Sequence, residues 1–135
     1  MKTIMIKIII GLVLCLFVSA SVGAADQWIK VAGGKWEPSP KMVADLKAQI
    51  ESYVRSQAKA QSRELKRWED YTFQYQGREE KGRKFIFINA VCGFNDQQTL
   101  HKQIIVILDG GSCFFNLKYD PSQKVLFDLF INGEA

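Results

Sequence analysis

The sequence predicts an α+β fold in which one long amphipathic helix covers one face of a curved antiparallel sheet of about five strands. Three observations support this prediction. Apolar side chains recur every three or four residues between positions 40 and 60, which is the period of a helix. From position 71 onward, apolar and polar residues alternate or form short β-branched runs, as strands do. One helical segment followed by several strands, without repeated alternation, indicates an α+β layer pair.

The first 24 residues are expected to be a secretory signal peptide that is removed. Lys2 and Lys7 supply a positive start, residues 8–18 form an unbroken apolar run, and small residues follow, so cleavage is expected near Ala24. The run is too short to span a membrane, because a spanning helix needs about 20 apolar residues. The chain contains no Asn-x-Ser/Thr sequence, which favours a bacterial protein exported to the periplasm or secreted. Residues 25–135 then form a single domain without a membrane anchor.

The mature domain is expected to carry little net charge. Lys2 and Lys7 leave with the signal peptide, so 16 of the 18 basic residues remain beside 14 acidic ones. These charges are spread along the chain, whereas nucleic-acid-binding proteins concentrate their basic residues in a stripe. The densest basic run, Arg63–Arg67, contains Glu64 and is typical of a solvated helix end. No nucleic-acid partner is therefore expected.

The two cysteines of the mature domain, Cys92 and Cys113, are expected to form a disulfide. Cys15 leaves with the signal peptide, and two remaining thiols of a small exported protein usually pair in an oxidising compartment. Closing a loop of about 20 residues stabilises a domain by about 3 kcal/mol if chain entropy dominates. Two cysteines with only His101 between them lack the four ligands of a structural zinc site. Neither a metal nor an organic cofactor is expected.

The helix is expected to begin at Ser39–Pro40 and to end near Ala60. Ser39 is suited to cap the first turn, and Pro40 suits the first helical position, where its missing N–H removes no hydrogen bond. Residues 26–38, before the helix, form a short extended piece that Gly33–Gly34 interrupts. The side chains expected on the apolar face of the helix are Val43, Leu46, Ile50, Tyr53, Val54 and Gln57.

Strands joined by short turns are expected after the helix. The expected strands are residues 71–76, 85–92, 103–108, 114–119 and 125–131. Residues 77–82 and 120–123 are expected to be turns, and Pro121 sets the first torsion angle of the second one. Residues 109–112, with the sequence Asp-Gly-Gly-Ser, are expected to form a hairpin turn because glycine readily adopts the positive φ that tight hairpins need.

The order of these elements resembles the cystatin-like fold. The resemblance is carried by Gly33–Gly34, by the single long helix, and by the hairpin sequence Phe-Gln-Tyr-Gln-Gly at positions 73–77. Inhibitory members of that family insert an N-terminal glycine region, a Gln-x-Val-x-Gly hairpin and a Pro-Trp hairpin into the cleft of a cysteine protease. Gly34 and Gly77 match two of these glycines, but Phe73 and Tyr75 replace the glutamine and the valine, and the Pro-Trp pair is missing. The resemblance implies the fold more strongly than it implies protease inhibition.

The sequence predicts a binding protein, and two hypotheses about its ligand stay open. In the first, the N-terminal segment and the hairpin ends contact another protein, because Trp and Tyr are frequent anchors of interfaces. The residues nominated for that surface are Trp28, Gly34, Trp36, Tyr75 and Gly77. In the second, the helix and the sheet enclose a pocket for a small apolar ligand. The same aromatic side chains are also explained by the core that a small domain needs to be stable.

A thiol hydrolase is a further alternative. It would use Cys113 as nucleophile, His101 as base and Asp109 as the orienting group, as in other activated thiols. The expected disulfide leaves no free thiol, and the residues around Cys113 lack the G-x-S-x-G spacing of a nucleophile elbow. No enzymatic activity and no catalytic residue are therefore expected.

Overall fold

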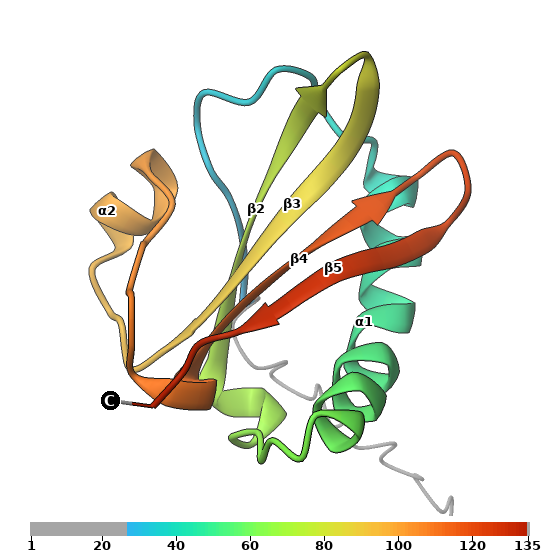
Figure 1. Cartoon of the computed structure of the whole chain (residues 1–135). Helices are drawn as coiled ribbons and strands as arrows, with labels where there is room; N and C mark the ends of the chain where they lie inside the picture. Colours follow the sequence, from blue (N-terminus) through green and yellow to red (C-terminus); the bar gives the residue numbers. More distant parts are fainter. Residues whose placement is uncertain (1–26, 135) are drawn as a thin grey trace, which may run out of the picture.

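The computed structural model describes residues 27–134, which form one five-stranded sheet with a long helix packed on one face (Figure 1). The expected signal peptide, residues 1–24, lies outside the described residues. The strands, in sheet order, are β1 (Trp28–Lys30), β2 (Tyr71–Glu80), β3 (Arg83–Cys92), β4 (Phe114–Asp120) and β5 (Val125–Ile131). The helices are α1 (Pro40–Ala60) and α2 (Gln97–Lys102), with 3-10 turns at Trp68–Asp70 and Gly111–Cys113. Within residues 27–134, neither helix is long and apolar enough to cross a membrane. The predicted α+β class is confirmed.

Helix α1 begins and ends where the sequence predicts. The Ser39 hydroxyl accepts a hydrogen bond from the backbone N–H of Met42 at 3.2 Å, and Pro40 opens the first turn. The basic run Arg63–Arg67 follows the helix rather than ending it. The buried face is slightly different from the expected one, because Ala58 takes part in it and Tyr53 and Gln57 lie at its margin.

The layer between α1 and the sheet is the main core of the protein. Side chains at every second position of the strands point toward the helix, and most of them are fully buried. The largest of these are Tyr71, Phe73, Ile86, Ile88, Phe115, Leu117 and Tyr119. Leu46, Ile50 and Val54 of α1 meet them from the other side. Burying these apolar side chains together is what holds the helix on the sheet.

Strand β1 makes the sheet mixed rather than antiparallel, which corrects the prediction. It pairs in parallel with β2, from Trp28 opposite Phe73 to Lys30 opposite Tyr75, whereas the other neighbours are antiparallel. The chain leaves β1, passes through α1 and returns to β2 in the same direction, as in a βαβ crossover. A three-residue strand shows too little alternation for its pairing direction to be read from the sequence.

Strand β2 extends past its expected end and places Gly77 inside the sheet. The predicted turn over residues 77–82 is wrong, because β2 continues to Glu80 and only Lys81–Gly82 forms the turn. Both turn residues have positive φ, 50° at Lys81 and 77° at Gly82, as in the two-residue hairpins that suit the twist of a sheet.

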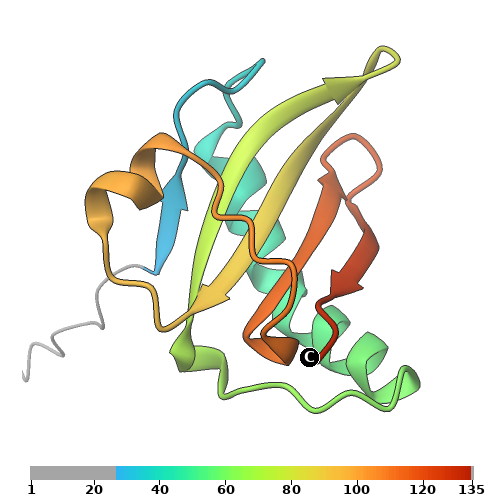
Figure 2. The same cartoon turned by 60° about the vertical axis from the view of Figure 1, so that its left-hand side comes forward.

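The predicted strand 103–108 is wrong as well. Residues 93–112, here called the strap, cross the outer face of the sheet, which is the face away from α1 (Figure 2). The strap is held by side-chain amides of the sheet, since Gln74 and Asn89 bond its backbone around Ile105. Only Ile105 of its apolar run is buried, and Leu108 is 91% exposed. Strand β4 already occupies the edge of β3, so the strap has no place in the sheet.

The predicted disulfide between Cys92 and Cys113 is confirmed and joins the two ends of the strap. Cys92 ends β3, Cys113 directly precedes β4, and their Cα atoms are 5.2 Å apart. The predicted hairpin turn over residues 109–112 is wrong. Gly110 and Gly111 do have positive φ, but they lead the strap into a 3-10 turn, where the Gly111 N–H donates to the carbonyl of Gly133 at 3.0 Å.

Candidate functional site

Three segments that are distant in the sequence meet at one end of the molecule around an open cleft. They are residues 34–42, which lead into α1, the β2–β3 turn, and the β4–β5 turn. The cleft between them, here called the end cleft, has a volume of about 710 Å³. Its wall includes Trp36, Met42, Lys81, Arg83, Lys84 and Pro121. This volume lies within the range of about 300–1,000 Å³ that ligand pockets usually have.

Trp36 is fixed to strand β2 by its backbone and by its ring. It forms an isolated antiparallel bridge with Gly77, and the N–H of Lys35 donates to the Gly77 carbonyl at 2.9 Å. The indole N–H of Trp36 donates to the carbonyl of Arg78 at 2.8 Å. A Cβ atom at position 77 would lie 2.2 Å from the Trp36 carbonyl oxygen. Gly77 is therefore required for this close approach, and it positions the first wall of the end cleft.

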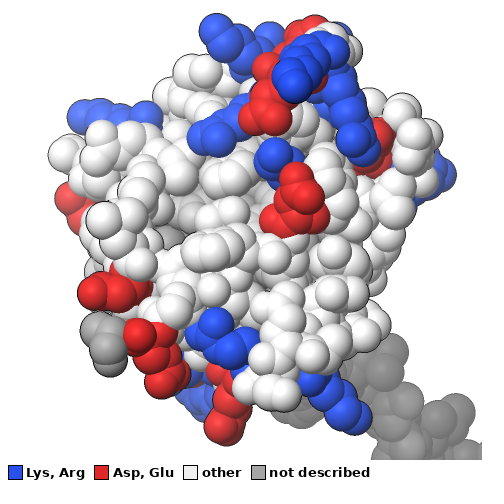
Figure 3. Space-filling view, in the orientation of Figure 1, with Lys and Arg blue, Asp and Glu red and all other residues white. Residues whose placement is uncertain are grey.

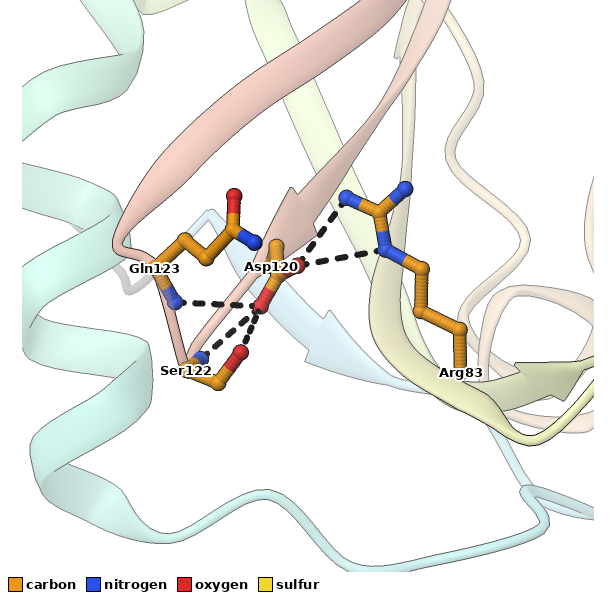
Figure 4. A network of polar contacts seen from close by, with 4 residues as sticks. All are labelled: Arg83, Asp120, Ser122 and Gln123. Atoms are coloured by element: carbon orange, nitrogen blue, oxygen red, sulfur yellow. Dashed lines mark hydrogen bonds and ion pairs between the residues drawn. The ribbon is translucent and has the colours of Figure 1, made fainter.

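Asp120 ties the other two segments together (Figure 4). Its carboxylate accepts hydrogen bonds from Arg83 at 2.9 and 3.2 Å, and from the hydroxyl and N–H of Ser122 at 2.7 and 2.9 Å. The N–H of Gln123 adds a bond of 3.2 Å. These bonds, foremost the one from the Ser122 hydroxyl, lower the pKa of Asp120 from 3.8 to about 2, although burial opposes them. The Asp120 network thus holds the β4–β5 turn against the tip end of the β2–β3 hairpin, where β3 begins.

We expect the Asp120 network to make stability depend on pH below about 4. The unfolded chain takes up the proton nearer 3.8 and the folded one only near 2, so the stabilisation is complete above pH 4 and is lost as the pH falls through this window. A shift from 3.8 to about 2 corresponds to about 2 kcal/mol at about 1.4 kcal/mol per unit. In urea unfolding, Asp120→Asn should be less stable than wild type by that amount at about pH 6 and equally stable at about pH 2.

The matched control for this prediction is Asp109→Asn, which changes an exposed carboxylate on the strap. Its unfolding free energy should follow that of the wild type across the same pH range. A constant difference between wild type and Asp120→Asn at both pH values would contradict the assigned role of the Asp120 carboxylate.

The rim of the end cleft carries positive charge that is not neutralised within the described residues. Lys81 and Lys84 make no ion pair there, whereas Arg83 pairs with Asp120 at 2.9 Å. Glu37, the acidic residue of the wall, pairs with Lys30 and raises the pKa of that lysine. Figure 3 shows Lys and Arg side chains at the free end of the β2–β3 hairpin, with Asp and Glu side chains among them.

A second hollow lies next to the end cleft. This side hollow has a volume of about 340 Å³, and Trp36 and Glu37 belong to the walls of both depressions. Gly34, Gln76 and His101 contribute to its surface. The two hollows, here together called the groove, share Trp36 and Glu37 in their walls.

The structure brings together three of the five residues nominated for the interaction surface. Gly34, Trp36 and Gly77 lie at the end of the sheet, in the walls of the groove. Trp28 and Tyr75 lie on the α1 side instead, with their ring centroids 6.1 Å apart, and both pack against the main core.

Sequence reasoning missed most of the end cleft. The missed residues are Met42, Lys81, Arg83, Lys84, Asp120 and Pro121. The sequence Asp-Pro-Ser at positions 120–122 is a turn signal in which the aspartate bonds the following backbone, so the Asp120 turn contacts were accessible from the sequence. The pairing of Asp120 with Arg83 could not be predicted from the sequence, because it depends on how β3 and β4 lie next to each other in the sheet.

The three residues of the thiol alternative lie in different surroundings. Cys113 is bonded to Cys92 and has no free thiol in this structure. His101 belongs to the wall of the side hollow, and its Nδ1 atom is 2.7 Å from the carbonyl oxygen of Gln97. Asp109 is exposed on the strap. Among residues 27–134, no three His, Cys, Asp or Glu side chains form a cluster able to hold a metal ion.

The cystatin-like resemblance rests on element order, and the structure changes the place of one residue that carries it. Gly77, which matches the glycine of the inhibitory hairpin, lies within β2 against Trp36 and not at the tip of the hairpin. The tip is formed by Lys81–Gly82. No known protein family, curated protein or solved structure matches this chain in sequence or structure comparison.

Proposed function

We propose that this protein is a small exported binding protein and that its end cleft receives a segment of another protein. The observation that carries the proposal is that hydrogen bonds within this protein hold three separate segments in place around one cleft. Trp36 donates a hydrogen bond to the Arg78 carbonyl and forms a β-bridge with Gly77. Asp120 joins the other two segments through its hydrogen bonds to Arg83 and Ser122. A surface that is ordered before binding loses less conformational entropy when a ligand arrives.

The packing under α1 favours this site over a pocket between the helix and the sheet. Leu46, Ile50, Ile88 and Leu117 are at most 1% exposed and fill that layer. An apolar ligand under the helix would have to displace these side chains, at the cost of the core contacts they make. The end cleft, in contrast, is open to solvent and needs no rearrangement to be entered.

The shape of the end cleft favours a receiving site over an inserted wedge. The cystatin-like resemblance implies insertion of hairpin tips into a protease cleft. Here the tips surround a hollow with Trp36 and Met42 in its wall, and a wedge would leave this hollow unfilled. A protein segment that enters the hollow would bury these apolar side chains, which is the usual source of binding energy at the centre of an interface.

The proposal predicts that a photoreactive group in the end cleft captures a partner and that the same group elsewhere does not. Benzoylphenylalanine in place of Glu37, which is exposed in the wall of the cleft, is compared with the same residue in place of Glu51, which is exposed on α1. In an extract of the source cells, the Glu37 position should give one protein adduct, suppressed by excess unmodified wild type. The Glu51 position should lack that adduct. Absence of the adduct at Glu37, or equal capture at both positions, would rule out the end cleft as the binding surface.

A further inference from the structure

We infer that the segment received by the end cleft is acidic and carries an apolar side chain that packs against Trp36 and Met42. This inference rests on the proposed function, because it specifies the chemistry of the partner of the same site. It follows from the charges of the three segments, from the apolar wall of the cleft and from the extent of the groove.

Each of the three segments around the end cleft carries lysines that make no ion pair among the described residues. They are Lys35 before α1, Lys81 and Lys84 on the β2–β3 hairpin, and Lys124 in the β4–β5 turn. Lys81 and Lys84 belong to the wall of the end cleft itself. The acidic side chains at this end are mostly neutralised already. Glu37 pairs with Lys30, Glu80 with Lys118, and Asp120 with Arg83, which leaves Glu79, opposite Lys84 in the β2–β3 ladder, against four lysines. Excess positive charge on a concave surface attracts a negatively charged ligand and speeds its association.

The backbone conformation at the tip of the hairpin does not account for a lysine at position 81. Lys81 has φ of 50°, in the left-handed region that asparagine and glycine adopt at this position of a tight hairpin. A lysine there gives no advantage to the turn, and its side chain is exposed rather than packed. Its ammonium group is therefore available to a ligand at the cleft.

The wall of the end cleft combines apolar surface with this charge. Trp36 and Met42 are partly buried against the main core, and Pro121 faces them from the β4–β5 turn. The Lys84 ammonium lies 6.0 Å from the centroid of the Trp36 ring. A ligand that fits both features has an apolar group at its centre and carboxylates on its flanks.

The extent of the groove favours an extended chain over a compact small molecule. Trp36 and Glu37 line both the end cleft and the side hollow, so a ligand that fills both hollows must extend past these two residues. A peptide several residues long can do this with one side chain in the end cleft. A single compact molecule would fill one hollow only.

The test uses two synthetic fluorescent peptides and fluorescence polarisation. Both have a leucine at the centre; one has aspartate and glutamate on the flanks, and the other has asparagine and glutamine in their place. At low ionic strength, the acidic peptide should bind about tenfold more tightly or better, and added salt should remove most of this difference. Lys81→Glu combined with Lys84→Glu should abolish the preference for the acidic peptide.

The matched control is Lys59→Glu combined with Lys66→Glu, which makes the same change in net charge at the far end of α1. It should leave the preference unchanged. Equal binding of both peptides, or equal loss of the preference in both double variants, would overturn the acidic chemistry. Tighter binding of decanoate or of oligothymidylate at the same site would overturn it in favour of a small carboxylate or a nucleic acid.

The outcomes separate this inference from the proposed function. A protein adduct at Glu37 together with equal binding of the two peptides retains the end cleft as the binding surface and rejects an acidic ligand. A preference for the acidic peptide that survives Lys81→Glu with Lys84→Glu rejects the inference, because the acidic ligand then binds elsewhere. Absence of both the adduct and the peptide binding rejects the inference and the function together.

Discussion

Replacing Gln74 by leucine is expected to lower the free energy of unfolding by about 3–4 kcal/mol, although the two side chains are similar in size. Gln74 is fully buried in the middle of β2 and uses its whole amide. Its nitrogen donates to the carbonyls of Leu100 and Gln103, both at 2.8 Å. Its oxygen accepts from the N–H of Ile105 at 2.9 Å and from the Asn89 amide at 3.0 Å. Leucine would leave these groups without partners in an apolar environment, where each costs about 1–3 kcal/mol.

Gln74→Leu should weaken the attachment of the strap locally, in addition to lowering the free energy of unfolding of the whole domain. The disulfide still joins the ends of the strap, so the strap stays near the sheet but loses its central attachment. Hydrogen exchange of the Ile105 amide should therefore accelerate more than exchange in β3, and urea unfolding gives the total loss. Thr72→Val is the control, because it lies on the same strand and faces the same side. A Gln74→Leu protein within about 1 kcal/mol of wild type would contradict the proposed attachment.

Replacing Gly77 by alanine is expected to cost about 3 kcal/mol and to disrupt the end cleft. The added Cβ atom would lie 2.2 Å from the Trp36 carbonyl oxygen and 3.1 Å from the carbonyl carbon, so backbone must move. The segment that carries Trp36 would then separate from β2, with loss of the bond from the Lys35 N–H and of the indole bond to Arg78. The variant should lose affinity for the acidic peptide together with stability.

Gly133→Ala is the control for the Gly77 variant. Position 133 has no atom within 4 Å of an added Cβ, so the substitution should change stability by less than about 0.5 kcal/mol. Thermal unfolding of both variants measures the difference. A Gly77→Ala protein as stable as Gly133→Ala, with unchanged peptide binding, would show that Trp36 can shift without cost and that its position is not fixed by β2.

Three of the four strands that were predicted correctly, β2, β4 and β5, bury one face more than the other, whereas β3 is buried on both faces. Tyr71, Phe73 and Tyr75 alternate with polar residues, and the structure places them on the α1 side. The prediction of a strand at residues 103–108 was wrong because several β-branched apolar residues in a row are compatible with a strand and with an irregular strap alike. What distinguishes the two is the partner of the backbone, and that partner is the Gln74 side chain, far away in the sequence.

The candidate site was predicted only in part, for a related reason. The importance of Trp36 and of Gly77 was accessible, since tryptophan and glycine are conspicuous residue types near expected turns. The specific role of Gly77 was not, because the turn it was assigned to begins four residues later. Lys81 and Lys84 looked like ordinary surface charges, and their significance depends on which acidic residues lie near them in space.

The sequence by itself determined the class of the fold, the limits of α1, four of the five strands and the disulfide. These features depend on local periodicity, on capping by Ser39, and on the pairing of the two cysteines within residues 27–134. Only the tertiary structure decided the parallel pairing of β1, the path of the strap and the assembly of the end cleft. Each of these depends on hydrogen bonds and ion pairs between distant segments, such as Gln74 with Ile105 and Arg83 with Asp120, and local sequence patterns carry no information about such partners.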